Sequence, residues 1–160
     1  MESYAIAYIN TPLGIAKVVR NDEGISEISV IEEKLPLTEH PSEVLTECIK
    51  QLNEYFEGHR KIFTVRLNPA GTSFQKRVWK ELLTIPFGKT STYMQQTLKL
   101  GDKKAIRAVA TANGKNPIWV IIPCHRVIGK DGSLTGYAGG LWRKKWLLEH
   151  ESPIEQTSLF

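Results

Sequence analysis

The residues best suited to covalent chemistry are Pro123-Cys124-His125-Arg126, which follow the apolar run at residues 119–122. A cysteine is nucleophilic as the thiolate, and a free thiol is mostly protonated at neutral pH. An adjacent histidine is one base that can take the proton. Taken alone, a cysteine after an apolar run is more often a small buried hydrophobe than a nucleophile. The rest of the chain has to decide between these two interpretations.

Length and cysteine content bound the class of protein. The 160 residues suffice for one domain or two small ones. We expect no membrane span and no signal peptide, because no apolar stretch is long enough and the N-terminus lacks a basic segment followed by an apolar one. The two cysteines, Cys48 and Cys124, then favour free thiols in a reducing compartment, the cytoplasm, or the nucleus of a eukaryote. The other histidines show no ligand-pair spacing, so we expect no metal and no cofactor.

Charge is distributed unevenly along the chain. Residues 1–69 hold 7 lysines and arginines against 11 aspartates and glutamates, a net charge of −4. Residues 70–151 hold 14 against 5, a net charge of +9. A basic half of this density favours a polyanionic partner, with nucleic acid first. A solubilising surface would explain the charge alone equally well.

The first half has the pattern of a small α/β unit. Runs rich in isoleucine and valine at residues 4–9, 14–19 and 25–31, separated by turn residues, predict an antiparallel meander. A helix should follow, because apolar residues recur there at helical spacing, and Cys48 belongs to that buried stripe. We expect a short strand at residues 62–67 and a boundary near residue 68. The helix-forming apolar positions are Val44, Leu45, Cys48, Ile49, Leu52, Tyr55 and Phe56.

The second half has the pattern of short helices. Thr72 and Gln75 fit a capping box, and that helix should extend to Pro86. A second helix is predicted from residues 90–92 to 100, stopped by Gly101, and a third, capped by Asp102, from 103 to about 112. Two short helices joined by a glycine-containing turn are typical of a helix-turn-helix. Glycines at 132, 136, 139 and 140 predict turns beside a small wing, followed by a helix at 141–148 and a frayed tail at 152–160.

The third predicted helix has an unusual exposed face. Lys103, Arg107 and Thr111 recur at four-residue spacing, and several alanines keep the helix thin. Such a helix could enter a narrow groove and direct one long cation into a duplex. A tightly packed helix with a solvated arginine explains the same residues.

Several of these segments, in this order and spacing, resemble one family. They are Arg107-Ala108-Val109, Asn116-Pro117, residues 122–127 around Cys124, Gly136-Tyr137 with Gly139-Gly140, and residues 146–148 with Glu151. The segments resemble the methylated-DNA–protein-cysteine methyltransferases, also called alkylguanine-DNA alkyltransferases, over roughly residues 70–151. The first half matches only weakly, as a variable α/β domain would.

The resemblance implies an α+β chain of two parts. A ribonuclease-H-like α/β domain at residues 1–68 would precede a mainly helical domain at 69–151. The second domain would carry a winged-helix-like helix-turn-helix, which binds DNA, and the active-site cysteine. Residues 152–160 would be a tail.

The resemblance also implies direct reversal of DNA damage. The family moves an alkyl group from the exocyclic oxygen of guanine, and less well of thymine, onto its own cysteine. Cys124 would be the acceptor, and the stable thioether would limit each molecule to one reaction. His125, through a water, would take the thiol proton, and Glu151 would orient His125. This is an arrangement of nucleophile, base and orienting carboxylate.

Other roles carry over in the same way. Asn116 would tie the turn around the site, and Tyr93 would press on the target phosphate and aid proton delivery to guanine. Arg107 would fill the gap left by the extruded base, because a base inside the duplex must be flipped out to react. Further DNA contacts are expected from Lys103, Ala108, Thr111 and Lys115. The substrate pocket would be formed by the backbone of Val127, Ala138 and Gly139, with Tyr137 as a wall and Trp119 near the alkyl group, unless its indole serves core packing. The partner would be double-stranded DNA carrying alkylated guanine, bound through its minor groove by a monomer.

Two departures from the family pattern stand out, and three other functions compete. Ala110 replaces a common glycine, and Ala138 stands where some members have serine. A lesion-recognition protein of the alkyltransferase-like kind would lack the cysteine, commonly replaced by tryptophan, whereas Cys124 is present. A helix-turn-helix regulator explains the basic half but not Cys124-His125 with Glu151 downstream. A cysteine hydrolase would need an oxyanion site, and no segment of the sequence marks one.

Overall fold

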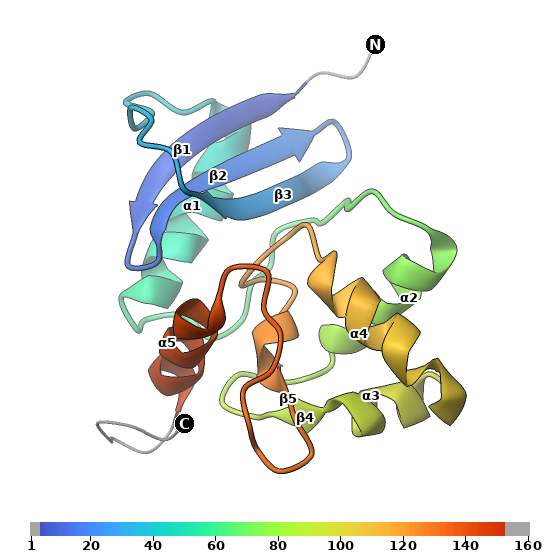
Figure 1. Cartoon of the computed structure of the whole chain (residues 1–160). Coiled ribbons are helices and arrows are strands. Elements are labelled where there is room, and N and C mark those ends of the chain that lie inside the picture. Colours follow the sequence, from blue (N-terminus) through green and yellow to red (C-terminus); the bar gives the residue numbers. More distant parts are fainter. Residues whose placement is uncertain (1–3, 153–160) are drawn as a thin grey trace. The chain divides into compact units, whose positions relative to one another are not determined.

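Three antiparallel strands and one helix form the first part of the chain in the computed structural model, which describes residues 4–152 (Figure 1). The strands are β1 (Ala5–Thr11), β2 (Gly14–Asn21) and β3 (Gly24–Ile31), in the order β1-β2-β3. Tight turns after Thr11 and Asn21 join neighbouring strands, so the chain forms the predicted meander. The meander prediction is confirmed.

Helix α1 (Glu43–Phe56) packs against β1 and β2. Its buried stripe recurs at helical spacing and includes Leu45, Cys48 and Leu52. Cys48 is 1% exposed, and burial raises the pKa of its thiol to about 12. Since only the thiolate reacts readily, Cys48 is a core residue, as the stripe predicted.

The strand predicted at residues 62–67 is wrong. That segment forms only an isolated bridge, between Leu67 and Ile25. Ile25 donates to the carbonyl of Arg66, and Asn68 donates to the carbonyl of Ile25. Gly24 lies so close that a Cβ there would be 2.7 Å from the Arg66 oxygen, and its φ is +155°. The segment therefore meets the start of β3 at one point instead of adding a strand to the sheet.

Contacts divide the chain between Ala70 and Gly71 into two compact units. The second unit begins with α2 (Ser73–Leu82), and the predicted capping box is present in full: Thr72 and Gln75 each accept the other's backbone N–H. The helix ends at Leu82, earlier than predicted. Tight turns take over, in which Thr84 and Ile85 donate to carbonyls three residues back, because the residue before a proline disfavours helical geometry.

The predicted helix-turn-helix is formed by α3 (Tyr93–Lys99) and α4 (Ile106–Gly114). Gly101, with a φ of +100°, ends α3, and Asp102 caps a short 3-10 turn, η1 (Lys103–Ala105), that leads into α4. The third predicted helix thus starts as a 3-10 turn and extends two residues farther than expected. Gln96 and Asn113 exchange two buried amide hydrogen bonds of 2.8 Å, which fix α3 against α4.

The last part of the described chain surrounds the cysteine. A 3-10 turn, η2 (Cys124–Arg126), leads into β5 (Val127–Ile128), which pairs in parallel with β4 (Ser91–Thr92). The predicted small wing does not form a hairpin, because residues 129–140 make turns and β5 pairs with β4 instead. Helix α5 (Leu141–Glu151) confirms the final predicted helix and extends it to Glu151. The predicted tail at 152–160 lies, beyond Ser152, outside the described residues.

Candidate active site

The turn that precedes Cys124 is held by one side chain. Asn116, which is buried, accepts from the backbone N–H of Ile118 at 2.9 Å and donates to the Ile122 carbonyl at 2.8 Å. The same amide donates to the sulfur of Cys124 at 3.2 Å. Val120, in the middle of the turn, has a φ of +74°, which a β-branched residue rarely adopts. Asn116 thus holds a strained turn closed and binds the sulfur at its end.

His125 and Glu151 form a buried hydrogen-bonded pair. Their Nε2 and Oε2 atoms are 2.7 Å apart, and both side chains are almost fully buried. Burial lowers the pKa of His125, so the imidazole is neutral at neutral pH. A carboxylate can only accept, so Nε2 carries the hydrogen and Nδ1 is left as the acceptor. Among residues 4–152, no protein atom forms a hydrogen bond with Nδ1.

Arg126 holds the same carboxylate from the other side. Its Nε donates to Glu151 Oε1 at 2.7 Å, its Nη2 to Oε2 at 3.0 Å, and its Nη1 to the carbonyl of Ile85 at 2.7 Å. Burial alone would raise the pKa of Glu151, but its electrostatic interactions and hydrogen bonds with His125 and Arg126 lower it. Glu151 is therefore ionised, and Arg126 joins the end of α5 to η2. The motif contained Arg126, but nothing in its spacing indicated this pairing.

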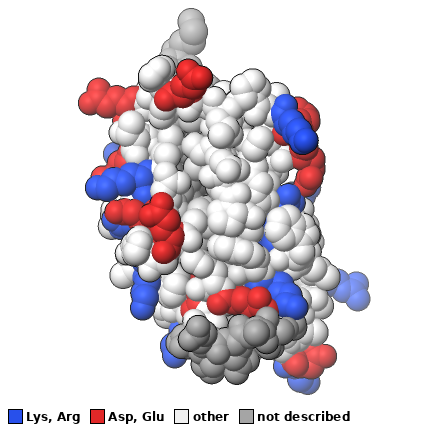
Figure 2. All heavy atoms as spheres, turned by 90° about the vertical axis from the view of Figure 1, so that its left-hand side faces the viewer, with Lys and Arg blue, Asp and Glu red and all other residues white. Residues whose placement is uncertain are grey.

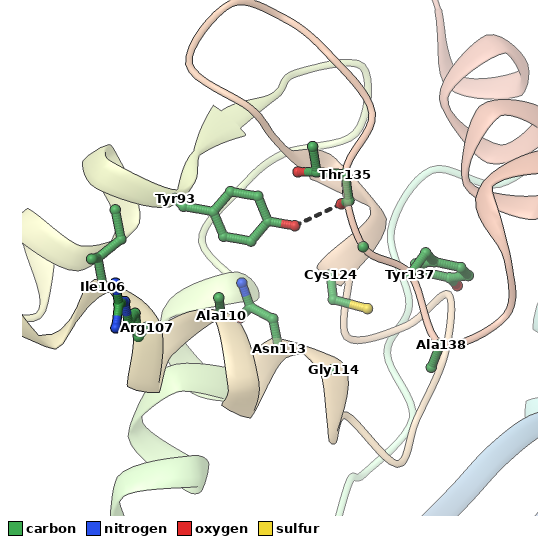
Figure 3. Close-up of a pocket in the computed structure, with 11 residues that line it drawn as sticks. Tyr93, Ile106, Arg107, Ala110, Asn113, Gly114, Cys124, Thr135, Tyr137 and Ala138 are labelled. Atoms are coloured by element: carbon green, nitrogen blue, oxygen red, sulfur yellow. Dashed lines mark hydrogen bonds between the residues drawn. The ribbon is translucent and has the colours of Figure 1, made fainter.

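A cavity of about 530 Å³ opens beside Cys124 (Figure 3). Helix α4 contributes one wall, and the loop at residues 135–138 contributes another. Tyr93, at the start of α3, donates its hydroxyl hydrogen to the Thr135 carbonyl at 2.8 Å. The cavity is lined by Tyr93, Ile106, Arg107, Ala110, Asn113, Gly114, Cys124, Thr135, Gly136, Tyr137 and Ala138.

The structure brings together only part of the predicted pocket and DNA-contact residues. Of the predicted pocket residues, Tyr137 and Ala138 line the cavity, whereas Val127, Gly139 and Trp119 are not among its lining residues. The indole of Trp119 packs against the Tyr137 ring, with centroids 5.7 Å apart, and against Gly139, where an added Cβ would lie 2.8 Å from it. Of the predicted DNA contacts, Tyr93 and Arg107 line the cavity. The others, Lys103, Ala108, Thr111 and Lys115, are exposed and do not line it.

Lys144 is a buried residue of the site that sequence reasoning missed. Its Nζ donates to the carbonyl of Thr135 at 2.9 Å and lies 3.5 Å from that of Gly136. Burial lowers the pKa of Lys144 to about 8. One signal could have found it: Lys144 is four residues before Leu148, which puts both on the same face of α5.

The thiol itself is held in a desolvated setting. Burial raises the pKa of Cys124, and the Asn116 hydrogen bond and the Lys144 charge oppose that rise. Burial also raises the pKa of Tyr93 and of Tyr137, so both phenols stay protonated at neutral pH. The resting site therefore holds a thiol, a neutral imidazole and two neutral phenols.

Fold and site together define a class of protein in which a cysteine at a cavity lies next to a helix-turn-helix. Residues 73–153 match the family model described as the DNA-binding domain of 6-O-methylguanine DNA methyltransferase, and residues 5–69 match the model of its ribonuclease-like domain. The chain belongs to this family, the methylated-DNA–protein-cysteine methyltransferases, and the predicted two-part fold is confirmed.

Relatives match over nearly their whole length. The methylated-DNA–protein-cysteine methyltransferase of Methanosarcina barkeri is 43% identical, over 89% of this chain and 94% of its own. That of Mycobacterium tuberculosis is 42% identical over 89% of each chain. The crystal structure of the M. tuberculosis O6-methylguanine methyltransferase matches with a TM-score of 0.85 at 39% identity, covering 98% of this chain and 97% of that one. The structure of M. tuberculosis OGT in complex with DNA matches with a TM-score of 0.82 at 43% identity, over 90% of each chain.

Proposed function

We propose that this protein repairs DNA by transferring a methyl or other alkyl group from the exocyclic oxygen of guanine to its own Cys124. The observation that carries the proposal is the position of the Cys124 sulfur, at a cavity next to the helix-turn-helix and beside the His125–Glu151 pair. Family membership supports the same reaction. Thymine would be the poorer substrate, as the resemblance implies. The lesion-recognition alternative has no support, because the cysteine it would lack is present.

The transfer is a displacement at the alkyl carbon. The thiol proton leaves for Nδ1 of His125, through a water, and the resulting thiolate attacks the carbon. A sulfur–carbon bond forms, the carbon–oxygen bond breaks, and its electron pair stays on the guanine. Guanine then takes a proton, which we assign to the Tyr93 hydroxyl. No protein step reverses the thioether, so each molecule reacts once.

Glu151 explains why His125 can act as the base. The carboxylate fixes the tautomer that leaves Nδ1 free to accept, and it stabilises the imidazolium that forms. Arg126 keeps the carboxylate ionised and fixed in place. Because burial lowers the pKa of His125, the imidazolium gives up its proton readily after the transfer, and the Tyr93 phenolate takes one up, so that both groups return to their neutral forms.

The target base has to leave the duplex to reach the cavity, since the alkyl carbon is inaccessible in a stacked base. We propose that Arg107 fills the gap, because it is exposed on α4 and also lines the cavity. Small residues at Ala108 and Ala110 would allow α4 to approach the minor groove. Lys103, Thr111 and Lys115 would contact the backbone, making binding largely independent of sequence and weaker at high salt.

The distribution of charge is consistent with a local DNA contact. Figure 2 shows one face of the molecule, on which acidic and basic side chains are interspersed. The cations that we assign to DNA lie instead on η1, on α4 and just after it. We propose that the protein acts as a monomer and in the compartment that holds the DNA, the cytoplasm, or the nucleus of a eukaryote.

The test of the proposed reaction is a mass measurement. The protein is incubated with an excess of a duplex oligonucleotide that carries one methylated guanine, and a matched unmodified duplex serves as the control. We expect one methyl group per chain, located on the peptide that contains Cys124, with the damaged duplex only. An unmodified Cys124 peptide after complete incubation would reject the transfer reaction.

Arg107→Ala should slow repair more than it weakens DNA binding. Losing the side chain that fills the gap should reduce the single-turnover rate at saturating DNA about tenfold, equivalent to about 1.4 kcal/mol. The affinity for DNA should change by less than about threefold, because contacts to phosphates supply most of that affinity and Arg107 is not assigned one. Lys103→Ala is the comparison, because Lys103 is exposed and does not line the cavity. Lys103→Ala should mainly weaken DNA binding. It should also reduce the slope of the logarithm of the binding constant against the logarithm of the salt concentration by about one. Equal effects of both variants on rate and affinity would contradict the role of Arg107.

A further inference from the structure

A pair of buried carboxamides, Gln96 on α3 and Asn113 on α4, lies at the cavity that holds Cys124. The two side chains exchange hydrogen bonds of 2.8 Å in both directions, each donating an N–H to the oxygen of the other. Gln96 is 0% exposed and Asn113 is 6% exposed, and of the two only Asn113 lines the cavity. Neither residue takes part in the methyl transfer as proposed so far.

The pair leaves half of the hydrogen-bonding capacity of Asn113 unused. A carboxamide has two N–H donors and an oxygen with two lone pairs. Asn113 uses one N–H and one lone pair on Gln96, and within residues 4–152 its side chain has no other hydrogen-bond partner. Buried polar groups are nearly always paired. The second N–H of Asn113 therefore suits a molecule that enters the cavity.

Asn113 also lies where a flipped base would have to lie. Figure 3 shows its side chain pointing from α4 into the cavity, between Tyr93 and Cys124. The alkyl carbon has to reach the sulfur of Cys124, so the attached base occupies the space beside it. Among the α4 residues that line the cavity, only Arg107 has another polar side chain, and we assign Arg107 to the gap in the duplex. The Asn113 amide is therefore the polar group that α4 offers to the base.

We infer that Asn113 is a substrate-binding residue that donates its second N–H to a ring nitrogen of the flipped base, and that Gln96 is the positioning residue that holds this amide. The inference rests on the proposed function, because it needs an alkylated guanine in the cavity. Alkylation of the exocyclic oxygen removes the hydrogen of the neighbouring ring nitrogen. Every ring nitrogen of the base except the one bonded to the sugar is then an acceptor.

Gln96 gives the Asn113 amide a fixed orientation before the base arrives. Two hydrogen bonds between the same two groups prevent either amide from turning, and a donor held in advance binds a substrate more effectively. Gln96 follows Tyr93 by three residues, which puts both on one side of α3. The backbone carbonyl of Asn113 accepts from the N–H of Asn116, which binds the sulfur of Cys124. The amide pair thus connects the base contact to the neighbours of both reacting groups.

The test uses a double variant, Gln96→Met with Asn113→Leu, in which apolar side chains of similar size replace both amides. No buried amide is left unpaired, so this protein should be nearly as stable as the unmutated one, whereas Gln96→Met alone should be less stable. The single-turnover rate at saturating damaged duplex should fall about five- to tenfold in the double variant, the effect of one lost hydrogen bond. Its affinity for DNA should change by less than about twofold, because the phosphate contacts remain.

Methyl transfer from the free nucleoside of methylated guanine is the second measurement. It requires neither DNA binding nor base flipping, so it reports on contacts inside the cavity. The double variant should lose the same factor in rate with this substrate. The control is Thr97→Val, because Thr97 is a 0% exposed polar residue of α3 that bonds to the Tyr93 carbonyl at 2.6 Å and does not line the cavity. This control should keep its rate with both substrates.

Unchanged rates in a folded double variant would overturn the inference, since amides that only join α3 to α4 would be replaceable by apolar side chains. An equal loss of rate in Thr97→Val would overturn it as well. If the double variant does not fold, the side-chain amide of Asn113 is followed by NMR in Cys124→Ser protein. One of its two hydrogens should shift downfield with the methylated duplex and not with the unmodified duplex, and equal spectra would overturn the inference. Absence of any methyl transfer by the unmutated protein would instead refute the proposed function.

Discussion

Cys124→Ser is expected to abolish alkyl transfer while leaving DNA binding almost intact. A serine hydroxyl is a weak nucleophile without strong activation, and the neutral His125 is a modest base for it. The single-turnover rate should fall at least about a thousandfold, in line with loss of a nucleophile in other enzymes. The exchange is close to isosteric, and Asn116 can donate to the new hydroxyl as it does to the sulfur. DNA affinity should therefore change by less than about twofold.

The matched control for Cys124→Ser is Cys48→Ala. Cys48 is the other thiol of the chain and is buried on α1. This variant should lose stability, because a buried group is removed. It should nevertheless take up one methyl group per chain. Transfer to Cys48, or residual methylation of Cys124→Ser protein, would show that the acceptor is elsewhere.

Glu151→Gln is expected to have the second-largest effect, because it weakens both folding and transfer. An amide oxygen cannot satisfy His125 and the two donors of Arg126, so a buried guanidinium is left without its counter-charge. Breaking a buried pair in this way costs about 3–5 kcal/mol. Transfer should slow by about a hundredfold or more, because the tautomer of His125 is no longer fixed.

Unfolding of the Glu151→Gln protein can be followed by tryptophan fluorescence. All four tryptophans of the chain lie in the second unit, which contains the site. The control is Glu149→Gln on the same helix, which removes only the pair with Lys145 at 3.9 Å. Such a pair contributes about 0–1 kcal/mol. Similar losses of stability in the two variants would contradict the special position of Glu151.

The difference in folding stability between the unmutated protein and Glu151→Gln should depend on pH. The pKa of Glu151 in the folded protein lies below its usual value of 4.5. The carboxylate therefore stabilises the fold fully above pH 4.5, and this contribution is lost as the pH falls toward the folded-state pKa. The stability advantage of the unmutated protein over Glu151→Gln should be constant from neutral pH down to about 5 and should shrink below that.

Local sequence signals predicted the elements of this protein well. The capping boxes, glycine stops and alternating strands act over a few residues, so Thr72 with Gln75 and the turn at Gly101 could be recognised directly. The errors arose where a distant segment decides the outcome. Residues 62–67 fail to form a strand because they meet β3 only at Ile25, near its start. The region after Val127 forms no wing because β5 pairs with β4, thirty-six residues earlier in the chain.

The sequence by itself determined the family and singled out Cys124 and its neighbour His125 as the candidate nucleophile and base, because these residues are adjacent in a specific motif. Only the tertiary structure decided how the charges behind them are arranged. Nothing in the local sequence assigned a partner to Arg126 or to Lys144. Both are buried, one on Glu151 and the other behind the cavity wall. A charge is stable in the interior only where the fold brings partners to it, and those partners lie far away in the sequence.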